Sequence, residues 1–171
     1  MEVMLSAFVL SVGVVGIMPL FISSFRDSLD SRDQVIASML AQEGVELVQN
    51  FRDTNKVSGA SGGVFDGTNF PTFDSDNCWV SYDNSGINCT GTYQLNLTAN
   101  NFYTHDTTGT LATKFQRKIG IKYSPASSNN VFAQKVTITS MVIWGVSFPG
   151  DISNCNTAHK CVYTSLILTK W

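Results

Sequence analysis

The sequence predicts an α+β protein, in which one long N-terminal α-helix packs by its second half on an antiparallel β-sheet head domain. Residues 1–54 contain a long apolar run followed by a helical pattern, whereas residues 55–171 are rich in Ser, Thr, Asn and Gly. A length of 171 residues, 43% of them hydrophobic, allows one globular domain and one extra element. We therefore expect a helix over residues 1–54 and a head domain over residues 55–171.

The run from Val3 to Phe25 contains no charged side chain. As a helix it is long enough to cross a bilayer core of about 30 Å. A signal peptide is the alternative, but no basic segment precedes the run and no small-residue cleavage site follows it. We predict that about residues 1–25 span a membrane.

The helical pattern continues past Arg26 without proline and without a turn signal. We predict a single helix from about Glu2 to Arg52, roughly 75 Å long. The glycine-rich segment from Asn55 to Thr72 ends it. Apolar residues in the second half recur at steps of three and four and form one stripe: Val35, Ile36, Met39, Leu40, Leu47, Val48 and Phe51.

Strands are expected after the helix, and several of them alternate apolar and polar residues as half-buried antiparallel strands do. Phe115, Ile119 and Ile121 provide one such alternation. The five predicted strands are Cys78–Tyr82, Thr92–Thr98, Lys114–Tyr123, Val131–Val146 and Val162–Trp171.

Four cysteines, all in the head domain, indicate folding in an oxidising compartment. Three pairings are possible. Cys78 with Cys89 and Cys155 with Cys161 close the shortest loops around plausible turns, and we prefer this pairing. The two crossed pairings remain open.

Composition and histidine content argue against other classes of protein. Eleven basic and 13 acidic residues give a formal charge of −2, which disfavours a nucleic-acid binder. His105 and His159 are the only histidines, and neither lies in a nucleophile motif, so we expect both in surface loops. A zinc site of Cys155, His159 and Cys161 has an unusual spacing. We predict no enzyme, no metal and no cofactor.

Glu2 is a lone carboxylate at the edge of the apolar helix, where burial without a partner is expensive. The simpler interpretation is that it marks the aqueous end of the helix and interacts favourably with the helix dipole. Gly13, Gly16 and Pro19 weaken the same helix. The simpler interpretation here is that the glycines allow close helix approach and that the proline introduces a kink.

The segment EVMLSAFVLSVGVVGIMPL resembles the N-terminal segment of type IV pilins and pseudopilins. Glu2 matches the family glutamate, and Pro19 matches the proline in the middle third of the helix. IASMLAQEGVELVQNFRDTN is similar to the second half of pilin helices, so the resemblance covers about the first 55 residues; the last strands resemble pilins only loosely. Pilins mature by cleavage after a glycine, whereas here only Met1 precedes Glu2, so the methylated residue is not identified.

The resemblance implies a pilin-like fold and a structural subunit that is stored in the inner membrane. With the pilus assembly machinery, such a subunit polymerises through its helix into an extracellular filament for motility, adhesion or DNA uptake. Glu2 would pair with the amino terminus of a neighbour, the helix would melt around Gly13, Gly16 and Pro19, and the C-terminal disulfide loop would face outward. The alternatives are a minor pilin, a type II secretion pseudopilin, or a single-pass membrane-anchored binding domain that does not polymerise.

Overall fold

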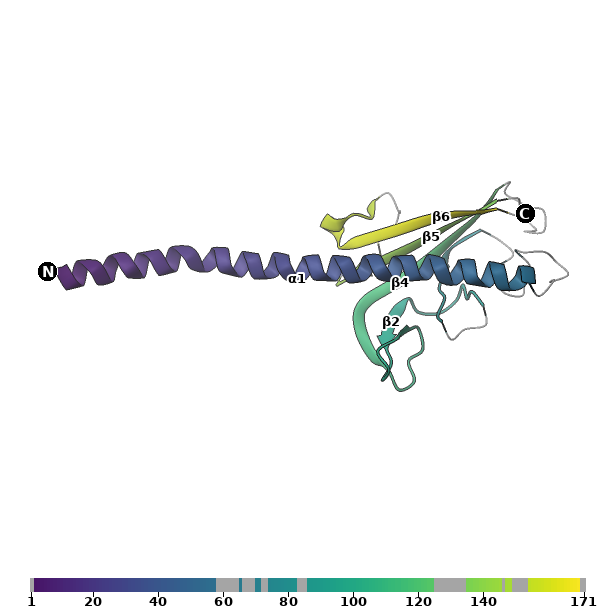
Figure 1. Cartoon of the computed structure of the whole chain (residues 1–171), viewed down its shortest axis with the longest axis horizontal. Coiled ribbons are helices and arrows are strands. Elements are labelled where there is room, and N and C mark those ends of the chain that lie inside the picture. Colours follow the sequence, from purple (N-terminus) through teal and green to yellow (C-terminus); the bar gives the residue numbers. More distant parts are fainter. Residues whose placement is uncertain are drawn as a thin grey trace. The chain divides into compact units, whose positions relative to one another are not determined.

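The protein combines one long helix with one antiparallel sheet and is therefore α+β, as the sequence predicts (Figure 1). The computed structural model describes residues 2–57, 65, 70–71, 74–82, 86–124, 135–145, 147–148 and 154–169. Contacts divide the chain into two compact units, Met1–Val35 and Ile36–Trp171. The second half of the predicted helix therefore belongs to the same compact unit as the sheet.

Helix α1 runs without interruption from Glu2 to Val57. It continues five residues beyond the predicted end at Arg52, because the glycines that stop it do not begin until residue 59. Pro19 lies inside the helix and does not end it.

The sheet has the strand order β3-β2-β4-β5-β6, and β1 also pairs with β4. All pairs are antiparallel. Strand β4 is the longest, and β1 and β2 pair with different parts of it. The strands are β1 (Ser75–Cys78), β2 (Gln94–Leu97), β3 (Tyr103–Thr104), β4 (Leu111–Ser124), β5 (Lys135–Trp144) and β6 (Cys161–Thr169), and a short 3-10 helix, η3 (Thr157–His159), precedes β6.

The first strand was predicted at Cys78–Tyr82, but β1 lies nearer the N-terminus, at Ser75–Cys78. Of the predicted residues, only Cys78 belongs to β1. Trp79 instead forms an isolated bridge with Asn88 inside the loop that the Cys78–Cys89 disulfide closes. The four later predictions coincide with β2, β4, β5 and β6, although some of their outer residues (131–134, 146 and 170–171) lie outside the described residues. The two-residue strand β3 has no counterpart among the predicted strands.

The core lies between one face of the sheet and the buried side of α1 after residue 36. This side differs in part from the predicted apolar stripe, because Val35 is 54% and Met39 is 64% exposed. Buried helix residues recur at steps of three and four, as an amphipathic helix requires: Ala37, Leu40, Ala41, Val45 and Val48. Ala37, Leu40 and Ala41 share one cluster with Phe115 and Val142 of the sheet, and Val48 shares another with Ile119 and Ile138. Alternate residues of β4 face this core.

A smaller cluster covers the opposite face of the sheet near the start of β6. Met141 and Ile143 of β5 pack there against the second disulfide, with Phe148 alongside. The loop closed by Cys155 and Cys161 thus shields part of the sheet face that the helix leaves uncovered.

Candidate functional site

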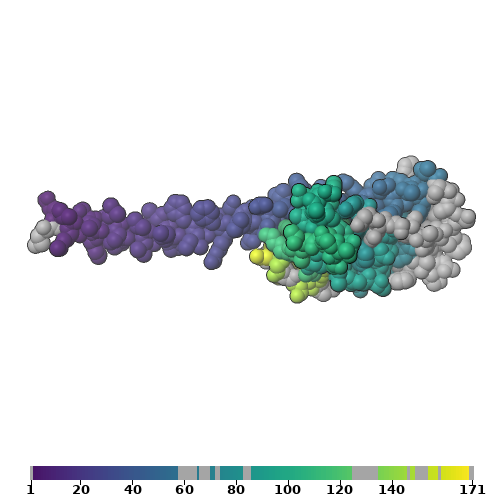
Figure 2. Space-filling model, turned by 90° about the horizontal axis from the view of Figure 1, so that it is seen from below, coloured from purple at the N-terminus to yellow at the C-terminus, as the bar shows by residue number. Residues whose placement is uncertain are grey.

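The first candidate site is the apolar part of α1, within the unit Met1–Val35. Its most apolar window of 18 residues has a mean hydropathy of 2.4, and none of those residues is buried. Among the described residues, α1 is the one helix long and apolar enough to cross a membrane. Figure 2 shows these side chains, in purple, around a single helix. Water is a poor solvent for such a surface.

Three of the four serine hydroxyl groups in this apolar segment donate to carbonyl groups of the helix itself. Ser6 donates to the carbonyl of Val3 at 2.9 Å, and Ser11 donates to that of Phe8 at 2.8 Å. Ser23 makes the same kind of bond further along. Because these three hydroxyl groups need no outside partner, they do not oppose the entry of the segment into an apolar environment.

The predicted assembly residues all lie on this segment. Glu2 opens α1 and is exposed, and Gly13 lies eleven residues later, close to three full helical turns. Gly16 follows one turn after Gly13, so these three residues lie along one side of the helix, whereas Pro19 lies further round it. A Cβ atom added to either glycine would meet nothing within 4 Å. The structure of the single chain therefore gives neither glycine an internal packing role.

Both short-range disulfides are present. Cys78 is bonded to Cys89, and Cys155 to Cys161. The first belongs to the larger helix–sheet core and the second to the small cluster on the other sheet face. The preferred pairing of neighbouring cysteines is therefore confirmed, and the two crossed pairings are wrong.

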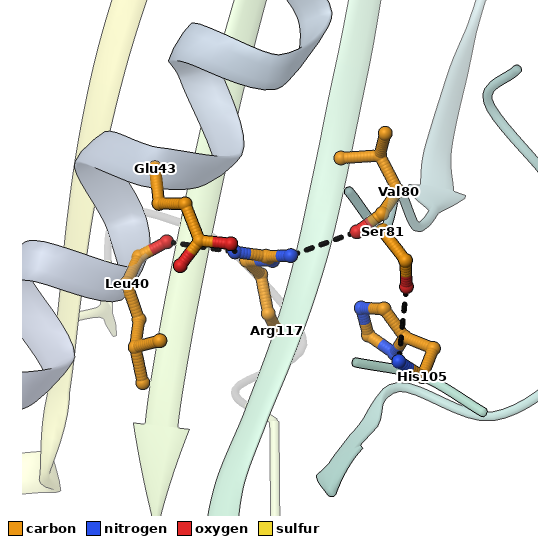
Figure 3. Close-up of polar contacts among 6 residues, drawn as sticks. All are labelled: Leu40, Glu43, Val80, Ser81, His105 and Arg117. Atoms are coloured by element: carbon orange, nitrogen blue, oxygen red, sulfur yellow. Dashed lines mark hydrogen bonds and ion pairs between the residues drawn. The ribbon is translucent and has the colours of Figure 1, made fainter. Parts of the chain in front are cut away.

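A second group of residues, the Arg117 network, is buried where α1 meets the sheet (Figure 3). Arg117 extends inward from β4 and is fully buried. Its guanidinium donates to the carbonyl of Leu40 on the helix at 3.2 Å and to that of Val80 at 2.7 Å. Glu43, one helical turn after Leu40, forms an ion pair with it at 3.4 Å. Burial lowers the pKa of Arg117, and the Glu43 carboxylate opposes that shift.

Gly44 allows the helix to approach the sheet beside this network. A Cβ atom at this position would overlap the hydroxyl of Ser140 on β5 and would come within 3.0 Å of the Cδ atom of Arg117. A glycine inside a helix normally costs about 0.5–1 kcal/mol. Here the loss is offset by close packing of helix on sheet.

His105 is buried near the same network, so the expectation of a surface-loop histidine is wrong at this position. Its backbone N–H donates to the Ser81 hydroxyl at 2.9 Å, and its ring lies 5.0 Å from that of Trp79. Burial, followed by the charge of Arg117, lowers the pKa of His105 to about 4. Neither ring nitrogen has a hydrogen-bond partner among the described residues, although the nearby carbonyls of Gln94 and Thr92 oppose the pKa shift. The imidazole is therefore neutral at neutral pH.

His159 is exposed on η3, as expected, and its ring contacts the side chain of Asn156. The two cysteines beside it are disulfide-bonded, which leaves no thiolate for a zinc site. No group of three or more His, Cys, Asp or Glu side chains suited to a metal ion occurs in the described ranges.

Sequence reasoning missed Arg117 and Gly44, although both carry a signal. Arg117 stands at the inward position between Phe115 and Ile119, so the alternation of β4 already places its charge in the core. Gly44 interrupts the apolar stripe of an otherwise strong helix-forming segment, which indicates a packing reason.

The fold and these sites define an α+β protein with an exposed apolar N-terminal helix and a disulfide-bonded head. No protein-family model matches the sequence, and no curated protein or solved structure matches the chain.

Proposed function

We propose that this chain is a structural subunit of the type IV pilin class, which polymerises through the first half of α1 into a filament on the cell surface. The observation that supports the proposal best is the exposed apolar segment of α1 with Glu2 at its beginning. In this proposal the protein has no catalytic activity and needs no cofactor.

The size of the apolar surface explains why it requires an apolar environment. Fifteen large apolar side chains between Val3 and Phe25 are exposed in the isolated chain. Burying one such side chain contributes about 1.5–3 kcal/mol, so the fifteen together contribute on the order of 20–45 kcal/mol. That exceeds the whole stability of a typical domain. The proposed environments are the inner membrane before assembly and the helical bundle of a filament afterwards.

Glu2 gives a reason to prefer a filament over a plain membrane anchor. An anchor gains nothing from a carboxylate in line with two glycines, whereas a bundle of identical helices can use all three. Gly13 and Gly16 have free space around them within one subunit, so a neighbouring helix can approach closely there. A buried Glu2 needs a cation, and the amino terminus of an adjacent subunit would set the axial register.

The head domain would occupy the outside of the filament. Its two disulfides suit an oxidising exterior. In this arrangement the partners are further copies of the chain, the inner membrane and the pilus assembly machinery. Motility, adhesion and DNA uptake are the roles that such filaments serve.

The test compares Glu2→Ala with Glu46→Ala, which removes an exposed carboxylate from the second half of the same helix. We expect both variants to remain in the membrane fraction, because insertion depends on the apolar run. Filament yield should fall strongly in Glu2→Ala alone, because only that variant loses the charge that sets the register. Normal filament numbers in Glu2→Ala would refute the register role, and absence of filaments in the unmodified strain would favour a membrane-anchored binding domain.

A further inference from the structure

Strand β6 ends the strand order of the sheet, and no described strand pairs with its outer edge (Figure 1). Its nine residues, CVYTSLILT, include no charged residue and no proline. Its pairing with β5 is continuous over all nine positions, without a bulge. Charges, prolines and bulges are the usual devices that keep an edge strand from pairing with another chain. β6 has none of the three.

The hydrogen bonds at the beginning of β6 identify the residues that face the free edge. The N–H of Trp144 donates to the carbonyl of Lys160 at 3.1 Å. Since bonded pairs alternate along an antiparallel ladder, Val162 and every second residue after it direct their backbone groups to β5. Cys161 fits this alternation, because its backbone N–H donates away from β5, to the carbonyl of Asn156. The backbone groups of Tyr163, Ser165 and Ile167 therefore face outward.

The same three residues carry side chains on the sheet face that the helix does not cover. Tyr163 is 52% exposed and Ile167 is 62% exposed, and both are large apolar residues. Ser165 lies midway between them and is also exposed. The edge thus presents free backbone groups and two apolar side chains placed symmetrically about Ser165.

We propose that the β6 edge binds a second copy of this chain, strand against antiparallel strand, with Ser165 of each copy at the two-fold axis. Tyr163 then lies opposite the second copy's Ile167, and an aromatic residue opposite a β-branched one is a favourable cross-strand pair. On the other face of the sheet, Thr164 faces Leu166 and Val162 faces Leu168. Between Cys161 and Thr169 no charged side chains oppose each other in this register, and about six backbone hydrogen bonds form across the edge.

A two-fold contact of this kind closes on itself and does not generate a helical repeat. It therefore differs from the helix contacts of the proposed filament, and it would join two heads from separate subunits or separate filaments side by side. The inference does not depend on the proposed function, and it can be tested on unassembled chains.

The test uses the full chain in detergent micelles, with Ser165→Cys and, as the matched control, Thr139→Cys. Thr139 lies beside Ser165 on the neighbouring strand β5, one strand spacing of about 4.8 Å further from the axis. Paired Ser165 positions lie about 5.5 Å apart between Cα atoms, which suits a disulfide, whereas paired Thr139 positions are too far apart. We expect covalent dimers from Ser165→Cys at a level at least about tenfold above Thr139→Cys on a non-reducing gel.

Two further variants test the register. A mixture of Tyr163→Cys and Ile167→Cys chains should give mixed dimers, whereas Tyr163→Cys alone should not, because like positions lie apart in the antiparallel arrangement. Adding Ile167→Lys to Ser165→Cys should weaken dimer formation about two- to thirtyfold, since two cross-strand pairs are lost per dimer. Equal cross-linking of Ser165→Cys and Thr139→Cys, or efficient self-cross-linking of Tyr163→Cys, would overturn the proposal.

Discussion

The ion pair between Glu43 and Arg117 leads to the most detailed prediction. Arg117 is fully buried, whereas the Glu43 side chain is 37% exposed and lies 3.4 Å from it. Glu43→Gln keeps the size of the side chain and one oxygen acceptor but removes its charge. The positive charge of Arg117 then stays in the core without its carboxylate partner.

The magnitude follows from the distance. Coulomb's law gives about 5 kcal/mol for unit charges 3.4 Å apart at an effective dielectric constant near 20. Water at the exposed carboxylate screens this attraction, so we expect Glu43→Gln to lower the free energy of unfolding by about 2 kcal/mol. For a chain of this size the melting temperature should fall by about 4–8 °C.

The assay is thermal unfolding of the full chain in detergent micelles, followed by near-ultraviolet circular dichroism. The control is the same substitution in an Arg117→Met background, where no buried charge remains. Glu43→Gln should then have little effect, within about 0.5 kcal/mol. An equal loss of stability in both backgrounds would refute the assignment of Glu43 as the partner of Arg117, and so would no loss in either.

Three other predictions concern His105, Gly44 and the middle of the helix. The folded-state pKa of His105 is about 4 and its ordinary value is 6.5, so its neutral form stabilises the fold above pH 6.5 and this stabilisation is lost as the pH falls toward 4. Unfolding measurements should show about 2 kcal/mol lost between pH 7 and 5, and a His105→Gln chain with the same slope would contradict this. Gly44→Ala should destabilise the chain by about 1 kcal/mol in thermal unfolding, because overpacking against Ser140 outweighs the gain in helix propensity. Gly13→Ala, which meets no other atom, should not destabilise it; equal effects of the two substitutions would refute the packing role of Gly44. In an assembled filament we expect regular helix to be lost between Gly13 and Ile22, although α1 is unbroken in the single chain, and a filament structure with normal helical hydrogen bonds there would reduce Pro19 to a kink.

The long helix was predictable because its signals are local. No turn signal interrupts the apolar run from Val3 to Phe25 or the helical pattern that follows it, and the apolar residues after Val35 repeat with the helical period. Four of the five predicted strands coincide with β2, β4, β5 and β6, whereas the two-residue strand β3 was not predicted. Cys78–Tyr82 was displaced because a disulfide loop, and not a ladder partner, determines the conformation of Trp79.

The Arg117 network could not be assembled from the sequence, because its members come from three distant segments. Arg117 contacts Leu40, which is 77 residues away, and Val80, which is 37 residues away. Alternation along β4 indicates that Arg117 faces inward, but it does not identify which helix carbonyl or carboxylate meets it. His105 was misplaced for a related reason, since its burial depends on Trp79 and Ser81, and no local pattern links these residues.

Electron microscopy of sheared cell-surface material, combined with mass spectrometry of the filament protein, tests the proposed function most directly. We expect filaments whose main or minor component is this chain, with peptides from the head domain and with the apolar helix protected from protease inside the filament. Filaments should be lost on deletion of the chain and restored by the unmodified copy but not by Glu2→Ala. Surface material without this chain, found while the chain stays in the membrane fraction, would contradict the proposal.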